Sequence, residues 1–335
     1  MSDIAVIGCG YWGPNLIRVL CTLPYQGNVH VCDMNSIRLQ MIHNRYPMVK
    51  ITSELSSIIE NPSIDKVIIA TPISTHYDLA KRSLKAKKHV FVEKPLTENS
   101  RYAEELVKLS DEVDKILMVG HTFEFSPPVM KIKELIQNGD LGEIYFITTS
   151  RVNLGLHQRD VSVIWDLAPH DFSILFHILN EVPVSINAFG KDYIQKSIPD
   201  VAFINLEFPS KVIAHVQVSW LAPSKLRRTA IVGSKKMLIW EDTDPMEKVK
   251  IYDKGVDLPD PQSFGEFQLS YRTGDIISPK IASTEPLQTE ILHFLECCKT
   301  KKIPLTDGRS GLRVVKALEM AEASLLNQGS KVYWE

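Results

Sequence analysis

The chain has 335 residues, of which 44% are hydrophobic and 23% charged, a composition typical of a globular protein long enough for two domains. Its formal net charge of −2 gives no electrostatic reason to expect nucleic acid or an anionic membrane as a partner. The first residues lead directly into a strand pattern, and no apolar run reaches transmembrane length. We therefore expect a cytoplasmic protein with no signal peptide and no membrane span.

The cysteines do not have the spacing of a disulfide framework or a zinc site. They lie at positions 9, 21, 32, 297 and 298, an odd number without a CxxC pair. We expect reduced thiols and no bound metal.

Residues 4–33 have the pattern of a strand, a glycine-rich turn, a helix and a second strand. An apolar strand at 4–7 leads into Gly8-x-Gly10-x-x-Gly13, a helix passes through 16–20, and a strand at 29–32 ends before Asp33. Gly8 lets the chain turn off the strand, Gly10 has no Cβ to block a pyrophosphate, and Gly13 lets the helix approach the sheet. The unpaired N–H groups at the start of the helix favour phosphate. The pattern predicts a Rossmann site for a dinucleotide.

Asp33 indicates which dinucleotide is bound. A carboxylate after the second strand accepts hydrogen bonds from both ribose hydroxyls and repels a 2′-phosphate, which favours NAD over NADP. Two alternatives stay open. Asp33 could be a helix N-cap, a role that Asn35 or Ser36 could fill equally well. Arg38 could reach a 2′-phosphate if Asp33 turned aside.

Strands and helices continue to alternate up to residue 119. We expect helices that end near Tyr46 and that span about 54–60, 75–86 and 98–112, and strands at 66–70, 89–92 and 116–119. This alternation is typical of a doubly wound α/β domain with a parallel sheet of about six strands. We assign residues 1–121 to this domain.

The pattern changes after Gly142. Segments with alternating apolar and polar residues predict strands at 144–153, 185–191, 202–208, 212–220, 229–232 and 236–240. We expect an antiparallel meander with helices on one face and the other face open. Helices are expected at 287–299 and 310–327, and Pro169 marks the first turn of another that runs to Leu179.

We assign residues 122–335 to this second, α+β domain, which would bind substrate and carry the oligomer contact. Its C-terminal helix could pack back on the first domain. The open face of a broad sheet is a natural association surface, so we expect a homodimer or homotetramer.

Lys94 follows the strand at 89–92, at the edge where open α/β sheets bind ligands. Pro95 restricts the backbone of Lys94 to extended conformations and gives a stiff turn. From the residues alone, Lys94 is either a cation placed for a ligand or an exposed lysine paired with Glu93.

Asp166 and His170 form a second group of candidate residues. Asp166 lies four residues before His170, so its carboxylate can reach one imidazole nitrogen and leave the other for a substrate hydroxyl. The alternative is that Asp166 or Asp171 is a helix-start charge and His170 a structural residue. Metal binding is less attractive because no third spaced ligand follows, although His157 could join them in space.

At these motifs the chain resembles the Gfo/Idh/MocA oxidoreductase family, named for glucose-fructose oxidoreductase, inositol dehydrogenase and a rhizopine-catabolism protein. The resemblance covers the whole chain. It rests on Gly8 through Gly13, Thr71-Pro72 through His76, Glu93-Lys94-Pro95, Gly120 through Phe125, and Asp166 through His170.

The resemblance implies that Lys94 is the catalytic lysine, often before a cis proline, that His170 transfers the proton, and that Asp166 is its partner. It also implies that residues 71–76 lie beside the cofactor ribose and nicotinamide. With the glycine loop, the expected cofactor contacts are Gly8, Gly10, Tyr11, Trp12, Gly13, Asp33, Met34, Arg38, Thr71, Pro72, His76, Glu93, Lys94 and His121.

A finer likeness narrows the substrate. Residues 11–15, 165–171, 271–275, 305–308 and 313–315 look like the branch that acts at C3 of nucleotide-linked sugars in surface-polysaccharide or aminosugar synthesis. Cations suit a diphosphate, although each could instead be a surface charge or part of a structural ion pair. The expected substrate contacts are Lys94, Arg151, Asn153, His157, Asp166, His170, Lys225, Arg227 and Arg272.

We therefore expect an NAD-dependent sugar or sugar-nucleotide dehydrogenase, with NADP disfavoured. His170 would take the hydroxyl proton and Lys94 would stabilise the developing alkoxide. One alternative is a free-polyol dehydrogenase of the inositol type, or one acting on a monosaccharide. Another is a non-catalytic NAD-binding regulator, which would have no chemical reason to keep Lys94, Asp166 and His170 together.

Overall fold

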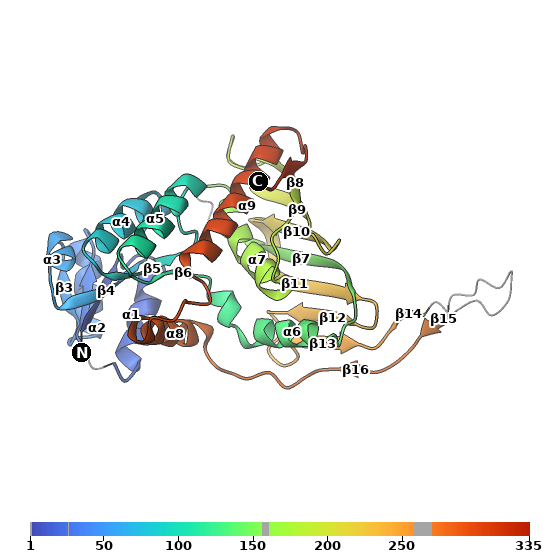
Figure 1. Ribbon diagram of the computed structural model, residues 1–335, viewed down its shortest axis with the longest axis horizontal. Coiled ribbons are helices and arrows are strands. Elements are labelled where there is room, and N and C mark those ends of the chain that lie inside the picture. Colours follow the sequence, from blue (N-terminus) through green and yellow to red (C-terminus); the bar gives the residue numbers. More distant parts are fainter. Residues whose placement is uncertain (1, 26, 156–160, 258–269) are drawn as a thin grey trace. The chain divides into compact units, whose positions relative to one another are not determined.

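A computed structural model of the chain describes residues 2–25, 27–155, 161–257 and 270–335 (Figure 1). The chain divides into two compact units. The first is Met1–Phe125 with Thr284–Lys316, and the second is Ser126–Ser283 with Ala317–Glu335. The sequence predicted a boundary after residue 121. The first unit instead ends four residues later, and it also includes a segment from the C-terminal part of the chain, Thr284–Lys316. The reason is that helix α8 (Pro286–Thr300) packs against the short helix η2 (Thr122–Phe125).

The first unit contains a six-stranded parallel sheet in the order β3-β2-β1-β4-β5-β6, which confirms the doubly wound α/β prediction. The strands are β1 (Asp3–Ile7), β2 (Val29–Cys32), β3 (Lys50–Thr52), β4 (Ile64–Ile69), β5 (His89–Glu93) and β6 (Leu117–Gly120). The helices are α1 (Gly13–Thr22), α2 (Ser36–Arg45), α3 (Ser56–Ile59), η1 (Ile73–Thr75), α4 (His76–Lys85), α5 (Ser100–Glu112), η2, α8 and the first part of α9 (Gly308–Leu326).

Helices cover both faces of this sheet, with α4 and α5 on one face and α1 and α8 on the other (Figure 1). Every residue of β1 is buried, as a parallel strand covered on both sides requires. On the α1 and α8 side, Leu16, Ile291 and Phe294 are fully buried in one cluster with Ile4 and Val6. The late helix α8 thus completes the hydrophobic core of the first unit.

The second unit contains a nine-stranded, mainly antiparallel sheet in the order β16-β13-β12-β11-β7-β10-β9-β8-β17, with β14 and β15 as a separate pair. Its strands are β7 (Ile144–Leu154), β8 (Ser185–Lys191), β9 (Val201–Glu207), β10 (Ile213–Ser219), β11 (Leu221–Gly233), β12 (Met237–Glu241), β13 (Val249–Tyr252), β14 (Gly255–Asp257), β15 (Ser270–Arg272), β16 (Ile276–Ile277) and β17 (Val332–Tyr333). Its helices are α6 (Pro127–Gln137), α7 (Val163–Leu179) and the last part of α9.

The simple meander predicted for this sheet is wrong in one respect. Strands β7 and β10 pair in parallel, with Phe146 opposite Ile213, because the chain passes through α7, β8 and β9 before it returns beside β7. Strand β11 also begins at Leu221, eight residues before the predicted strand, and its register with β7 shifts between Leu221 and Leu226.

The predicted start of α7 is also wrong. The helix begins at Val163, and Pro169 lies inside it instead of in its first turn. A proline removes one backbone donor from a helix interior, which is normally unfavourable. Here most of the helix is buried, including Trp165, Phe172 and Leu175, so tertiary packing outweighs the local preference. None of the helices within the described ranges is both long and apolar enough to cross a membrane.

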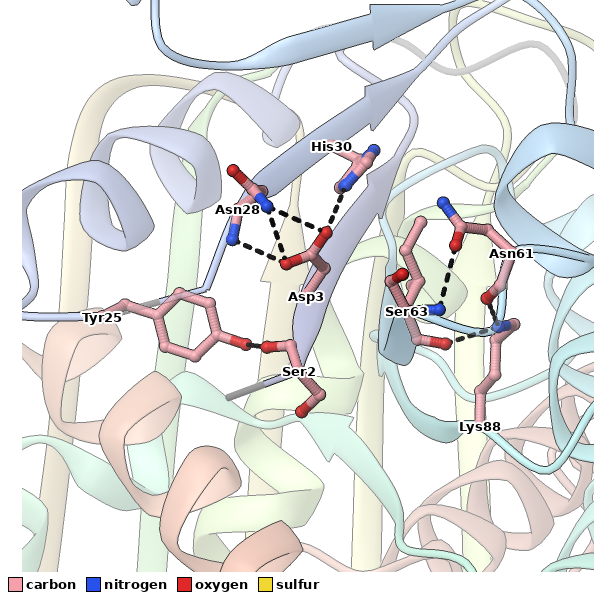
Figure 2. Close-up of polar contacts among 9 residues, drawn as sticks. Ser2, Asp3, Tyr25, Asn28, His30, Asn61, Ser63 and Lys88 are labelled. Atoms are coloured by element: carbon pink, nitrogen blue, oxygen red, sulfur yellow. Dashed lines mark hydrogen bonds and ion pairs between the residues drawn. The ribbon is translucent and has the colours of Figure 1, made fainter.

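A polar network ties together the amino ends of the first unit's strands (Figure 2). The Asp3 carboxylate accepts hydrogen bonds from the backbone and side chain of Asn28, and lies 2.9 Å from His30 Nε2. Next to it, the Tyr25 hydroxyl donates to the Ser2 carbonyl, and Lys88 donates to the carbonyls of Asn61 and Ile64. Burial raises the pKa of Asp3, but the bonds from His30 and Asn28 outweigh it and leave the pKa below its usual value.

We expect Asp3→Asn to lower the free energy of unfolding at neutral pH by about 1–3 kcal/mol, because Asp3 is almost fully buried and its bonds are charge-assisted. Since the folded-state pKa is depressed, this stability is present above the unfolded pKa near 3.8 and is lost as the pH falls through the folded value. Urea unfolding from pH 7 to pH 3 measures the difference. Glu112→Gln, at an exposed position, is the control, and an equal cost at both pH values would contradict the prediction.

Candidate active site

The sequence-predicted cofactor residues come together at the carboxyl edge of the six-stranded sheet. Gly8 directly follows β1, Asp33 follows β2, Thr71 lies just beyond β4, Glu93 ends β5 and His121 follows β6. Because all six strands are parallel, their carboxyl ends lie at the same edge of the sheet. The chain order also reverses direction between β1 and β4, which is where doubly wound folds form a ligand crevice.

The glycine loop is shaped by close backbone approaches. Gly8 has φ of +95°, and a Cβ there would lie 2.5 Å from the Ala70 carbonyl oxygen. A Cβ on Gly13 would lie 2.1 Å from the Gly8 carbonyl oxygen. At Gly10 the nearest heavy atom is Nη1 of Arg38, 3.7 Å from where a Cβ would be. The loop is therefore closed on its sheet side and open above Gly10, as a pyrophosphate at the start of α1 requires.

Asp33 is held by the loop before it and not used as the helix cap. Its Oδ2 accepts from Cys9 N and its Oδ1 from Asn35 N, each at 2.8 Å. The cap of α2 is Asn35, whose side chain accepts from the N–H groups of Ile37 and Arg38. Partial burial raises the pKa of Asp33, but these backbone bonds and the charge of Arg38 outweigh it, so the pKa is lowered. The Asp33 carboxylate is therefore held in a fixed position at the carboxyl edge of the sheet.

Several other residues predicted to contact the cofactor expose large apolar side chains near this edge of the sheet. Tyr11 is 87% exposed and Met34 is 95% exposed, which is unusual for large apolar side chains on a free surface. Pro72 is exposed as well, and Thr75 Oγ1 donates to Thr71 Oγ1 at 2.7 Å. A flat aromatic ligand such as the adenine or nicotinamide of a dinucleotide would cover such surface.

The Lys94 turn is fixed from below by His76. The Lys94–Pro95 peptide bond is cis. The buried His76 ring lies with Nδ1 2.8 Å from the Pro95 carbonyl and Nε2 2.8 Å from the Thr71 carbonyl. Burial lowers the pKa of His76, although the bonds to these carbonyls act against that shift. The structure thus places His76 as a link between two loops of the site, where its ring is not open to a ligand.

Beside Lys94 lie ionisable groups that are deeply buried. Glu93 is 9% exposed, and its Oε2 accepts from Lys94 N at 3.3 Å, while the Trp12 side chain also donates to it. Burial raises the pKa of Glu93 to about 7. His121 is 1% exposed, and burial together with the charge of Lys94 lowers its pKa to about 3. His121 is therefore neutral at physiological pH.

In the second unit, α7 presents Asp166 and His170 one turn apart. The indole Nε1 of Trp220, at the junction of β10 and β11, donates to Asp166 Oδ2 at 3.0 Å. Trp220 is 1% exposed, so the carboxylate is oriented by a rigid, buried donor. Asp166 and His170 therefore share one face of α7, with the acid fixed and the imidazole partly exposed.

Most of the cations expected to contact substrate lie in ion pairs. Arg151 Nε donates to Asp171 Oδ2 at 2.7 Å, and both side chains are almost fully buried. Arg227 pairs with Asp242 at 3.3 Å and Arg272 with Asp253 at 3.4 Å.

The remaining predicted substrate contacts differ in setting. Lys225 is exposed on β11. Asn153 lies two residues after Arg151 on β7, so the two share the face of the sheet on which α7 packs. His157 lies outside the described residues.

Two residues at these sites were not found from the sequence. Trp220 was treated as the end of an alternating strand, and nothing local indicated that its indole would reach Asp166. Glu290 on α8 is fully buried and accepts from Thr122 Oγ1 at 2.6 Å. Its only signal was an acidic residue on the apolar face of a helix, four residues before Phe294.

Comparison with known proteins agrees with this geometry. Residues 2–121 match the family model described as "Oxidoreductase family, NAD-binding Rossmann fold", and residues 129–239 match that of the Gfo/Idh/MocA C-terminal domain. The residues at the carboxyl edge fit NAD, because the open Gly10 position suits the pyrophosphate and Asp33 suits an unphosphorylated ribose.

Three similar proteins have named activities. Myo-inositol 2-dehydrogenase of Thermotoga maritima is 28% identical over 69% of this chain and 73% of its own. The NAD-dependent scyllo-inositol 2-dehydrogenase of Bacillus subtilis is 27% identical over 90% of this chain and 87% of its own. The solved structure of UDP-N-acetylglucosamine 3-dehydrogenase from Acidithiobacillus ferrooxidans covers 96% of this chain and 97% of its own, with TM-score 0.79 and 21% identity, a likeness of fold.

We expect the chain to bind NADH more tightly than NADPH, and Asp33→Ser to reduce or reverse the difference by removing repulsion of a 2′-phosphate. Fluorescence titration of both cofactors measures it. Arg38→Ala serves as the matched variant, because Arg38 is the cation nearest Gly10 and Asp33. Equal affinities in the native chain, together with loss of NADPH binding in Arg38→Ala, would show instead that Arg38 dominates the choice.

Proposed function

Because the chain belongs to the Gfo/Idh/MocA family of NAD-binding oxidoreductases, we propose that it transfers hydride between nicotinamide and a hydroxyl or keto carbon of a sugar. The observation that carries this proposal is the edge of the six-stranded sheet, where one cation, Lys94, stands in a fixed turn among the predicted cofactor loops. NAD supplies the two-electron acceptor or donor when bound.

The residues of this chain supply the polar part of the reaction. In the oxidative direction, His170 accepts the proton of the substrate hydroxyl at a ring nitrogen, and Asp166 stabilises the imidazolium that forms. Lys94 stabilises the negative charge that develops on the substrate oxygen, a task that a metal ion performs in other dehydrogenases. The reverse ketoreduction uses the same groups in the opposite order. Trp220 fixes Asp166, so the acid does not have to reorient during the reaction.

For the substrate, we propose C3 of a nucleotide-linked sugar used in polysaccharide or aminosugar synthesis. Support comes from the motifs at 11–15, 165–171 and 271–275, and from the exposed cation Lys225. A free polyol is the second candidate, because two relatives with named substrates, which match 69% and 90% of this chain, are inositol dehydrogenases. The ion pairs of Arg151, Arg227 and Arg272 weaken the case for a diphosphate site built from these arginines.

We also propose that the chain forms a homodimer or homotetramer through the open face of its nine-stranded sheet. Exposed apolar side chains on this face include Phe146, Phe189, Phe203 and Ile213. A shallow cavity of about 300 Å³ lies over β7, β11 and β12 and is lined in part by Phe146, Leu226 and Met237. Association would cover this apolar surface. Light scattering of the purified chain measures its mass in solution.

A screen of UDP- and dTDP-linked sugars against free inositols and monosaccharides, with NAD and NADH, tests the function. We expect turnover with a nucleotide sugar. Lys94→Ala should lower turnover by about 10²- to 10³-fold while NADH affinity changes little, because Lys94 acts on charge that develops in the transition state. Turnover of inositols alone would favour the second candidate. NADH binding without any turnover would indicate a regulator. Near-normal turnover of Lys94→Ala would show that Lys94 has a structural role and not a catalytic one.

His170 gives a test by pH. In the oxidative direction the rate should rise with pH through one ionisation, because only the neutral imidazole accepts a proton. We expect His170→Asn to depress the rate and remove this rise, and Asp166→Asn to move it to lower pH, since the charge that favours imidazolium is lost. The double variant should cost little more than His170→Asn alone. An unchanged pH profile in His170→Asn would assign the proton transfer to another group.

A further inference from the structure

Helix α8, in the C-terminal part of the chain, places the carboxyl group of Glu290 near Glu93, the residue before Lys94. Helix α8 packs on the first unit through Phe294, which meets Phe91 of β5 edge to face at 5.7 Å between ring centroids. Glu290 lies one turn before Phe294 and therefore on the same buried face, with no exposed surface. It accepts from Thr122, which stands two residues after Gly120, the partner of Glu93 in the sheet. Glu290 thus reaches the end of β6 beside the end of β5.

The hydrogen bonds around the two carboxyl groups are unequal. Glu93 receives donors from Lys94 N and from Trp12, and the ammonium of Lys94 is close enough to favour its charge. Glu290 receives one hydroxyl donor, and within the described part of the chain it forms no ion pair. An ionised carboxyl group buried with so little support is unfavourable by several kcal/mol. A negative charge in this cluster is therefore best placed on Glu93.

Several buried polar atoms of Glu93, His121 and Glu290, the carboxyl cluster, have no hydrogen-bond partner within the ranges that the structure describes, and this pattern favours a neutral Glu290. Glu93 Oε1, both ring nitrogens of His121 and Glu290 Oε1 have no hydrogen-bond partner among the described residues. Protonated Glu290 would offer a donor at Oε1, neutral His121 offers one donor and one acceptor, and ionised Glu93 offers an acceptor. Two ionised acids would offer only acceptors. Burial and the charge of Glu93 raise the pKa of Glu290 well above its usual value, in agreement with this assignment.

We propose that Glu290 is a positioning residue that acts as a neutral, hydrogen-bond-donating carboxylic acid and keeps the negative charge of this buried cluster on Glu93, beside Lys94. Glu290 accepts a hydrogen bond from Thr122 and so holds the turn after β6. Because Glu290 is neutral, it does not repel the charge of Glu93, which accepts hydrogen bonds from the backbone of Lys94 and from the Trp12 side chain. For its effect on turnover, the inference rests on the proposed role of Lys94.

Infrared spectroscopy tests the protonation state without turnover. At about pH 8.5, where Glu93 with its pKa of about 7 is ionised, we expect the carbonyl band of a protonated carboxylic acid, which shifts in D₂O and is absent in Glu290→Gln. The band should persist in Glu296→Gln, the control, because Glu296 is exposed on the same helix. A spectrum unchanged by Glu290→Gln would overturn the proposal. Since no substrate is needed, this result is independent of whether Lys94 proves catalytic.

Cofactor binding tests the location of the charge. Glu93 is faced by Lys94 on its own turn, by the Trp12 side chain and by Glu290 from α8. Glu124 acts on Glu290, and the neutral His121 lies within reach of the charge of Lys94. Its pKa is raised to about 7, so it takes up a proton as the pH falls through that value and loses the charge that attracts its donors. NADH affinity should then fall by about 10-fold between about pH 8 and pH 6, the effect of weakening one charged hydrogen bond.

Variants separate the two acids. Glu290→Gln should keep this pH dependence and retain turnover within about 3-fold, because glutamine preserves the shape and neutrality of the acid, whereas Glu93→Gln should remove the pH dependence. Glu290→Leu, which leaves Thr122 without its acceptor, should lower kcat about 10-fold with a smaller change in KM. Loss of the pH dependence in Glu290→Gln, or a Glu290→Gln enzyme as slow as Glu290→Leu, would show that Glu290 works as a charged group.

Discussion

The parallel register of the six-stranded sheet is the constraint on which the candidate cofactor site depends. Ile7 pairs with Cys32 on one side and Ile69 on the other, and Glu93 pairs with Gly120, so the strands end together. The glycine loop, Asp33, Thr71 and Lys94 are therefore neighbours although they are far apart in the chain. A slip of one residue in any strand would turn its side chains to the opposite face and separate these groups.

Within that frame, polar contacts fix the groups that we propose to face a ligand. Cys9 N and Asn35 N hold the Asp33 carboxylate, His76 joins the Thr71 and Pro95 carbonyls, and Trp220 fixes Asp166. Each fixing residue is itself on a strand end, a helix or a tight loop. Preorganised polar groups lose little freedom when a ligand binds, a property that favours catalysis.

The cost of burying ionisable side chains is met by an ion pair in the second unit and by protonation in the first. In the second unit, Arg151 and Asp171 form a close pair, so each buried charge is compensated by the other. In the first unit, Glu93 and Glu290 are two buried acids with few donors, and their burial favours uptake of a proton. The Arg151–Asp171 pair therefore joins β7 to α7. In our proposal the two acids instead make the electrostatics of the Lys94 turn depend on the protonation of Glu290, on a helix that begins at residue 286.

The sequence by itself determined the features that are local. The spacing of Gly8, Gly10 and Gly13 with Asp33 predicted the glycine loop and the parallel α/β sheet, and Glu93-Lys94-Pro95 predicted a stiff turn at the ligand edge. These predictions succeeded because turn geometry and strand alternation depend on neighbours in the chain. The start of α7, the parallel pairing of β7 with β10, the engagement of Arg151 with Asp171 and the arrival of Glu290 beside Glu93 were decided only by the tertiary structure. Each depends on which distant segment supplies the packing or the opposite charge, and that free energy has no signature in the local sequence.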